Sequence, residues 1–127
     1  DVWRVAILYV YGGIYSDLDT KCLKSINTWL KDEYDLIVYV ETKHGAICNY
    51  TFAAAPKHPA LLTVLNLFME IYNSDQFLRP DSPTPIQDFG AGGWSLGLLR
   101  HYDLENKMHL GGDFYNTVDK VKKEKTG

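Results

Sequence analysis

The first part of the chain is a nearly unbroken apolar run followed by a glycine pair and a polar turn. Residues 1–10 are apolar at every position after the second except Arg4, which predicts a helix that is buried because it is apolar all round. Gly12 and Gly13 are expected to end this helix, since glycine adopts the left-handed cap without a steric penalty. Residues 14–16 then predict a short buried strand that leads into an acidic turn.

Further along, predicted strands alternate with predicted helices. Residues 35–41 form a β-branched run typical of a strand buried on both faces, and residues 46–54 predict a second strand. An amphipathic helix follows, with its apolar stripe expected on the sheet, and another helix is predicted to begin near Gly92. The stripe consists of Leu61, Leu62, Leu65, Phe68, Met69 and Tyr72. Because strands and helices alternate, the predicted fold class is α/β.

Several shorter features complete the predicted organisation. Ser25 is expected to cap a single helical turn, because a serine hydroxyl satisfies a free amide at a helix start. Residues 77–88 contain three prolines and predict a long irregular loop. Residues 107–110 predict a final short strand, and residues from about 118 to 127 predict a solvated charged tail.

Composition argues against a nucleic-acid-binding protein, a disulfide-stabilised domain and a membrane-spanning segment. The 127 residues carry a net charge of -3 and show no basic face, so nucleic acid is not an expected partner. Cys22 and Cys48 fit neither a metal spacing nor a disulfide framework, so both are expected to be small buried apolar residues. No apolar run reaches the length of a membrane span, so a membrane is expected only through a segment absent from this sequence. The sequence begins without Met and inside a predicted helix, so we expect a partial domain, and the compartment is undetermined.

The acidic turn is the strongest candidate for chemistry. Asp17 and Asp19 stand two positions apart at the end of the predicted strand, so both should point one way and Leu18 should point into the core. Two carboxylates on one side repel each other, and a divalent cation would remove that repulsion. Mg²⁺ and Mn²⁺ are commonly held by few carboxylates and take further ligands from water and from the phosphates of a substrate.

Asp1 and Arg4 are the two charged residues of the apolar helix, and they lie one turn apart on the same face. A guanidinium and a carboxylate would suit a phosphate or a sugar hydroxyl, because both groups make directional contacts. The alternative is that Asp1 only caps the helix while Arg4 neutralises it. Sequence alone leaves both interpretations open. Asp1, Arg4, Asp17 and Asp19 are expected to meet at one place.

Two blocks of residues stand at fixed spacing around this turn. They are Asp1-x-x-Arg4 and Leu8-Tyr9-x-Tyr11-Gly12-Gly13-Ile14-Tyr15-x-Asp17-x-Asp19. Together they resemble the core signature of glycosyltransferase family 32, the enzymes with the DXD sugar-binding motif. Weaker resemblance continues through residues 23–26, 49–59 and 89–95. It therefore covers most of the chain to about Trp94 and then fades.

The resemblance implies a GT-A type, Rossmann-like α/β domain that lacks its N-terminal strands. It implies retaining transfer of a hexose from a nucleotide diphosphate sugar to a glycan or another hydroxyl acceptor, with Mn²⁺ or Mg²⁺ as cofactor. By resemblance, Asp19 binds the metal directly, whereas Asp17 contacts donor sugar or ribose and reaches the metal. Asp1 and Arg4 hold donor sugar hydroxyls, and Tyr15 lines the donor pocket.

Two observations keep other interpretations open. Phe89 and Ala91 replace the usual Thr and Pro of the resembled family, which favours a catalytically silent domain that binds nucleotide sugars and retains the motif. Tyr15 by its pattern alone predicts a core aromatic. A purely structural α/β module leaves the charges at Asp1 and Arg4 unexplained.

Overall fold

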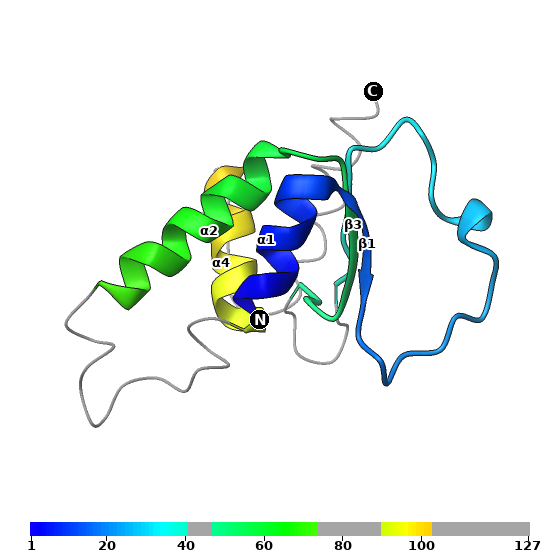
Figure 1. Cartoon of the computed structure of the whole chain (residues 1–127), viewed down its shortest axis with the longest axis horizontal. Helices are drawn as coiled ribbons and strands as arrows, with labels where there is room; N and C mark the ends of the chain where they lie inside the picture. Colours follow the sequence, from blue (N-terminus) through cyan, green and yellow to red (C-terminus); the bar gives the residue numbers. More distant parts are fainter. Residues whose placement is uncertain (41–46, 74–89, 103–127) are drawn as a thin grey trace.

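The computed structural model describes residues 1–40, 47–73 and 90–102. Within them, three helices lie together on one side of a small sheet (Figure 1). The helices are α1 (Val2–Tyr11), α2 (Pro59–Tyr72) and α4 (Ala91–His101), and a short 3-10 helix, η1, spans Ile26–Thr28. The strands are β1 (Gly13–Ser16), β2 (Leu36–Ile37) and β3 (Thr51–Ala54). This mixed architecture agrees with the predicted α/β class, and α4 begins within one residue of the predicted start.

The sheet has the order β1-β3-β2, with both pairs antiparallel. The predicted strands were too long: β2 and β3 keep only two and four residues of their ranges. Among the described residues beyond β2, Val40 and Ile47 form an isolated bridge, and the Cys48 amide donates to the Tyr39 carbonyl at 2.8 Å. The regular ladder therefore ends early, although the neighbouring backbone still pairs.

The core lies between the sheet and the helices. Phe52 at the centre of β3 packs against Trp94 of α4, with ring centroids 4.6 Å apart, and both side chains are fully buried. The indole N–H of Trp94 donates to the Cys48 carbonyl at 3.1 Å, so the one polar atom of that ring is satisfied. The other buried members are Val5, Leu8, Ile47, Ala54, Ala60, Leu61, Val64, Phe68, Leu98 and Leu99.

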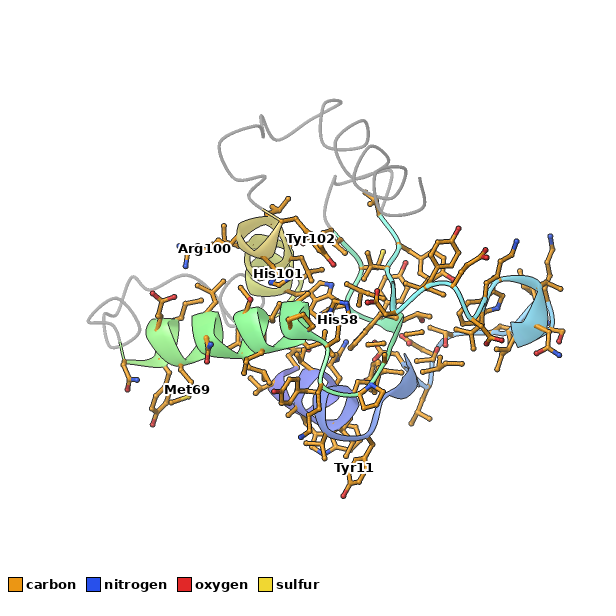
Figure 2. The ribbon with its side chains drawn as sticks, turned by 90° about the horizontal axis from the view of Figure 1, so that it is seen from above. Tyr11, His58, Met69, Arg100, His101 and Tyr102 are labelled. Carbon is orange, nitrogen blue, oxygen red and sulfur yellow. The ribbon has the colours of Figure 1, made fainter. Side chains whose placement is uncertain are left out.

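The prediction that the first helix and strand are buried was wrong. Only one face of α1 meets the core, and Tyr11 at its end is 75% exposed and points away from the ribbon (Figure 2). In β1 the burial pattern is mostly exposed, and Ile14 is 38% exposed. Apolar composition identified these elements, but in the described part of the chain nothing covers their outer faces. The exposed apolar residues of α1 are Val2, Trp3, Val10 and Tyr11.

Helix α2 is confirmed, but its apolar stripe is rotated from the predicted one. Leu62, Met69 and Tyr72 are exposed, and Met69 points away from the ribbon (Figure 2). The buried face packs against α4 and α1 and not chiefly on the sheet as predicted, because these helices lie side by side. That face consists of Ala60, Leu61, Val64, Leu67 and Phe68.

The start of α2 is fixed by a histidine. His58 is buried, and its Nδ1 accepts a hydrogen bond from the Ala60 amide at 3.1 Å. Because Nδ1 is an acceptor, the ring proton lies on Nε2, which is 3.4 Å from Asp35 Oδ1. His58 therefore ties the helix start to the segment that precedes β2.

Some smaller predictions have mixed outcomes. Cys48 is buried as expected, but Cys22 is exposed, with its thiol donating to the Lys24 carbonyl at 2.9 Å. Ser25 occupies the N-cap position of η1 without a side-chain capping bond. The predicted loop at 77–88, the strand at 107–110 and the tail at 118–127 lie outside the described residues. Over the described ranges, no helix has the length and apolar character needed to span a bilayer.

Gly97 of α4 lies against Val64 of α2 and leaves no room for a side chain. A Cβ atom at Gly97 would stand 2.8 Å from Val64 Cγ2 and 2.9 Å from Val64 Cα. Gly97→Ala should therefore lower the free energy of unfolding by about 1–3 kcal/mol, as overpacking typically does. Chemical denaturation measures the change, with the exposed Gly92 of the same helix as control. Gly92→Ala should leave stability unchanged or raise it by up to about 1 kcal/mol, and an equally harmless Gly97→Ala would contradict the close packing.

Candidate active site

The candidate site begins with the sharp connection between α1 and β1. Gly12 has a φ of 68°, and its amide donates to the Leu8 carbonyl at 2.8 Å, which ends the helix. A Cβ atom at Gly12 would stand 2.6 Å from Pro56 Cδ, so both the backbone conformation and the space require glycine. The chain reverses here, and the first turn of α1 consequently lies beside the end of β1.

Arg4 lies at the centre of the site, and its guanidinium reaches three acceptors. Nη2 lies 2.9 Å from Asp1 Oδ1, and Nη1 donates to the Asn49 carbonyl at 2.8 Å. Nη1 also lies 3.5 Å from Asp17 Oδ1. The Arg4 side chain is only 14% exposed, so its charge is largely sheltered from water and is balanced by the two carboxylates.

The structure bears on the alternative that Asp1 only caps the helix while Arg4 neutralises it. Asp1 occupies the N-cap position of α1, but its side chain makes no capping hydrogen bond. Its carboxylate instead pairs with Arg4 and remains 37% exposed. The ion-pair part of the alternative is therefore present, and the same carboxylate is still accessible to a ligand.

Tyr15 combines a core role with a role in the site. Its ring lies 5.9 Å from the Phe52 ring and 4.8 Å from the Arg4 guanidinium carbon, while its hydroxyl donates to Asp17 Oδ1 at 2.6 Å. The hydrogen bond to Asp17 is the main cause that raises the pKa of Tyr15 above 10.0, and partial burial adds to it. Arg4 acts in the opposite direction, and the charges of Asp17 and Asp19 raise the pKa of Tyr15 further.

Asp17 and Asp19 lie in a β-turn. The Asp17 amide donates to the Tyr50 carbonyl at 2.9 Å, and the Thr20 amide donates to the Asp17 carbonyl at 3.2 Å, which closes the turn. The prediction that Leu18 points into the core was wrong, because Leu18 is fully exposed. Alternation of side chains holds only while the backbone is extended, and β1 ends at Ser16.

The structure brings four of the five predicted site residues into direct contact. Asp1, Arg4, Tyr15 and Asp17 form one connected group, whereas Asp19 lies at the exposed tip of the turn. Within the described ranges Asp19 makes no hydrogen bond or ion pair. The negative charge of Asp19 nevertheless raises the pKa of Tyr15 slightly, after the larger contributions of Asp17 and burial.

The donor set of this turn suits a hard divalent ion. In the part of the chain that the structure describes, no group of three His, Cys, Asp or Glu side chains could form a closed metal site. One or two carboxylate oxygens, completed by water and ligand oxygens, match the way in which Mg²⁺ is usually bound. Asp19 is available for this without breaking a bond, whereas Asp17 is already held by Tyr15 and lies beside Arg4.

Several groups of the site were missed by the sequence reasoning. The Asn49 carbonyl accepts from the Arg4 guanidinium, and the Tyr50 carbonyl accepts from the Asp17 amide. Every residue has a backbone carbonyl, so the sequence does not show which ones act as acceptors. The hydroxyls of Ser16, Thr20 and Thr51 also surround the turn. Their flanking positions beside the acidic pair were a usable signal for Ser16 and Thr20, but not for the distant Thr51.

Tyr15 should lose its proton only above its ordinary pKa. Because the folded state favours the protonated phenol, its contribution to stability is present below pH 10.0 and is lost as the pH rises through the higher folded pKa. The ultraviolet tyrosinate signal of the wild type minus that of Tyr15→Phe should have its midpoint above 10.0. Asp17→Asn should lower this midpoint. Tyr39, whose pKa is raised by burial alone, should be unaffected by Asp17→Asn, and a Tyr15 midpoint at or below 10.0 would contradict the hydrogen bond.

Comparison with known families locates the same part of the chain. Residues 1–36 match the family described as "Glycosyltransferase sugar-binding region containing DXD motif". This range includes α1, β1 and the acidic turn, and so contains all five predicted site residues. The resemblance found from the sequence is therefore confirmed. No solved structure shows a significant match to this chain.

Two curated relatives extend the similarity beyond the turn. The chain is 40% identical over 126 residues, 83% of its own length, to an initiation-specific alpha-1,6-mannosyltransferase of Schizosaccharomyces pombe. It is 36% identical over 77 residues, 61% of its length, to inositol phosphoceramide mannosyltransferase 1 of the same organism. These alignments span 32% and 22% of the two relatives. The chain thus corresponds to about a third or less of each of these proteins.

Proposed function

Because the chain carries the sugar-binding region of the DXD-motif glycosyltransferases, we propose that it forms part of an enzyme that transfers a hexose from a nucleotide diphosphate sugar. The acceptor is a glycan or another hydroxyl compound, and the transfer retains the anomeric configuration. The observation that carries this proposal is the convergence of Asp1, Arg4, Tyr15 and Asp17 beside an exposed Asp19. Both relatives are named mannosyltransferases, so a mannose donor is the first one to test.

Asp1 and Arg4 are proposed to hold the hydroxyls of the donor sugar. The Asp1 carboxylate is partly exposed and accepts hydrogen bonds, and Arg4 fixes its direction at 2.9 Å. The Arg4 guanidinium also lies beside Asp17, so it is placed to orient both carboxylates. The Tyr15 ring packs against Arg4 and would line the donor site.

Asp19 and Asp17 are proposed to divide two tasks. Asp19 has a free carboxylate at the turn tip and would hold Mn²⁺ or Mg²⁺, whereas Asp17 keeps its bond to Tyr15 and would face the sugar or ribose. The bound ion would supply neutralisation of the diphosphate leaving group. In this chain, the hydrogen bond from the Tyr15 hydroxyl to Asp17 Oδ1 at 2.6 Å fixes the orientation of the Asp17 carboxylate.

We also propose that these elements form part of a larger GT-A type domain. In the described residues the sheet order β1-β3-β2 leaves β1 and β2 each paired on one side. The chain spans only 32% of the first relative, and further strands could satisfy these open edges. Such strands would also complete the wall that grips the nucleoside of the donor.

Calorimetric titration of the full-length protein with a panel of nucleotide diphosphate sugars, with and without Mn²⁺, tests the proposal. We expect Mn²⁺-dependent binding of one donor, followed by slow hydrolysis that releases its nucleoside diphosphate. Binding without any turnover would favour the silent sugar-binding alternative instead. Failure of every donor to bind in the presence of Mn²⁺ would contradict the proposed function.

A further inference from the structure

The turn that carries Asp17 and Asp19 is held by more than its own backbone. The Thr20 hydroxyl donates to the Asp17 carbonyl at 2.6 Å, in addition to the Thr20 amide, which reaches the same oxygen. The Thr20 hydroxyl also meets the Ser16 hydroxyl. Ser16 in turn lies 3.1 Å from the Thr51 hydroxyl across the β1–β3 pair. Three hydroxyls therefore connect β3 to the carbonyl of Asp17.

The direction of this chain follows from counting protons, because each hydroxyl has one proton to donate. Thr20 gives its proton to the Asp17 carbonyl, so Ser16 must be the donor in the contact between Ser16 and Thr20. Thr51 gives its one proton to the Tyr50 carbonyl at 2.8 Å, so its 3.1 Å contact with Ser16 brings the two hydroxyls together without a proton between them. Aligned hydroxyls of this kind strengthen one another.

This chain adds a second hydrogen bond to the Asp17 carbonyl, which the Thr20 amide also contacts. The Asp17 carbonyl belongs to the peptide that leads into Leu18 and Asp19, so fixing that oxygen fixes the plane from which the turn continues. Within residues 1–40, 47–73 and 90–102 the Asp19 side chain has no hydrogen bond or ion pair of its own. The direction of its carboxylate therefore depends on the turn backbone, and hence on Thr20.

We propose that Thr20 is a positioning residue, which, together with Ser16, orients the turn so that the Asp19 carboxylate can bind a metal–diphosphate ligand beside Asp17. This inference rests on the proposed function. The hydroxyl is the part that acts, since the Thr20 amide alone still closes the turn. Thr20→Val should therefore keep the turn but loosen it. Groups that orient metal ligands typically change metal affinity or activity by 10–100-fold when they are removed.

The test uses Mn²⁺ with inorganic pyrophosphate as probe, titrated calorimetrically into the full-length protein. Thr20→Val should weaken binding about tenfold or more, whereas Thr20→Ser, which restores the hydroxyl, should stay within about twofold of the wild type. Thr28→Val is the matched control. Thr28 closes its own turn in the same way, with its hydroxyl 2.7 Å and its amide 3.0 Å from the Ser25 carbonyl. Thr28→Val should leave pyrophosphate binding unchanged.

The outcomes separate this inference from the function on which it rests. Wild-type binding by Thr20→Val, together with lost binding by Asp19→Asn, would overturn the role of Thr20 and leave the proposed function intact. Equal losses in Thr20→Val and Thr20→Ser would also overturn it, because the hydroxyl would then be irrelevant. Wild-type binding by Asp19→Asn would overturn the metal assignment and the Thr20 inference with it. The thermal midpoints of Thr20→Val and Thr28→Val should shift by similar amounts, since the local bonds removed are alike.

Discussion

Asp19→Asn is expected to abolish metal-dependent donor binding while leaving the fold intact. The Asp19 side chain is exposed and makes no bond among the described residues, so its amide replacement should change the free energy of unfolding by less than about 0.5 kcal/mol. Loss of the charge would remove the proposed metal ligand itself. Even orienting groups beyond the ligands are worth 10–100-fold, so we expect Mn²⁺ affinity to fall by about 100-fold or more.

Asp32→Asn is the control for this experiment, because Asp32 is also an exposed aspartate and lies in the turn after η1. It removes the same charge from the protein without touching the candidate site. Its Mn²⁺ affinity, measured by the same calorimetric titration, should match that of the wild type. Unchanged affinity in Asp19→Asn would show that the ion binds elsewhere, and equal losses in both variants would indicate a general effect of net charge.

Arg4→Lys should sharply reduce sugar transfer and also destabilise the protein. The guanidinium contacts Asp1, the Asn49 carbonyl and Asp17 at once, and a lysine ammonium cannot reproduce that planar, forked geometry. We expect a loss of at least about tenfold in transfer rate and about 1–3 kcal/mol in the free energy of unfolding, since three partly buried acceptors lose their donor. Transfer assays and chemical denaturation of the same preparation measure the two effects.

The matched control is Arg100→Lys in α4. Arg100 is an exposed arginine that pairs with Glu70 at 3.2 Å, and exposed ion pairs contribute little to stability. Its replacement should alter neither transfer nor unfolding beyond about 0.5 kcal/mol. Full activity in Arg4→Lys would mean that Arg4 serves only to neutralise the two carboxylates, as in the structural alternative.

The sequence predicted the elements that depend on local chemistry. Helix α1 ends where Gly12 supplies the positive φ that other residues avoid, and β1 begins directly after it. The amphipathic repeat predicted α2 for the same local reason. Burial was predicted less well. The apolar run before Gly12 shows that this helix would be stabilised by burial, but it does not show whether another element packs against its outer face. The ends of the strands also depend on pairing with distant residues, which a sequence pattern does not contain.

In the candidate site, too, the side chains were predictable from the sequence and the backbone contacts were not. Asp1, Arg4 and Asp17 were predictable from their charged side chains, whereas Tyr15 was assigned to the site only by the family resemblance. The structure brings all four together. The error at Leu18 came from extending strand alternation into a turn that only the backbone bonds reveal. Carbonyl acceptors far away in the sequence were equally invisible, although one accepts from the Arg4 guanidinium and the other from the Asp17 amide.

Strand β3 contributes residues both to the candidate site and to the hydrophobic core. Its first residue, Thr51, belongs to the hydroxyl chain under the acidic turn, and the next residue, Phe52, fills the centre of the core against Trp94. Opening of this strand therefore disrupts site and core in one cooperative event, so the amides of β1 and β3 should exchange with solvent at a common rate. A ligand that binds only the closed form will slow that exchange in proportion to its saturation. Occupancy of the proposed sugar site could thus be measured through the exchange of the β1 and β3 amides.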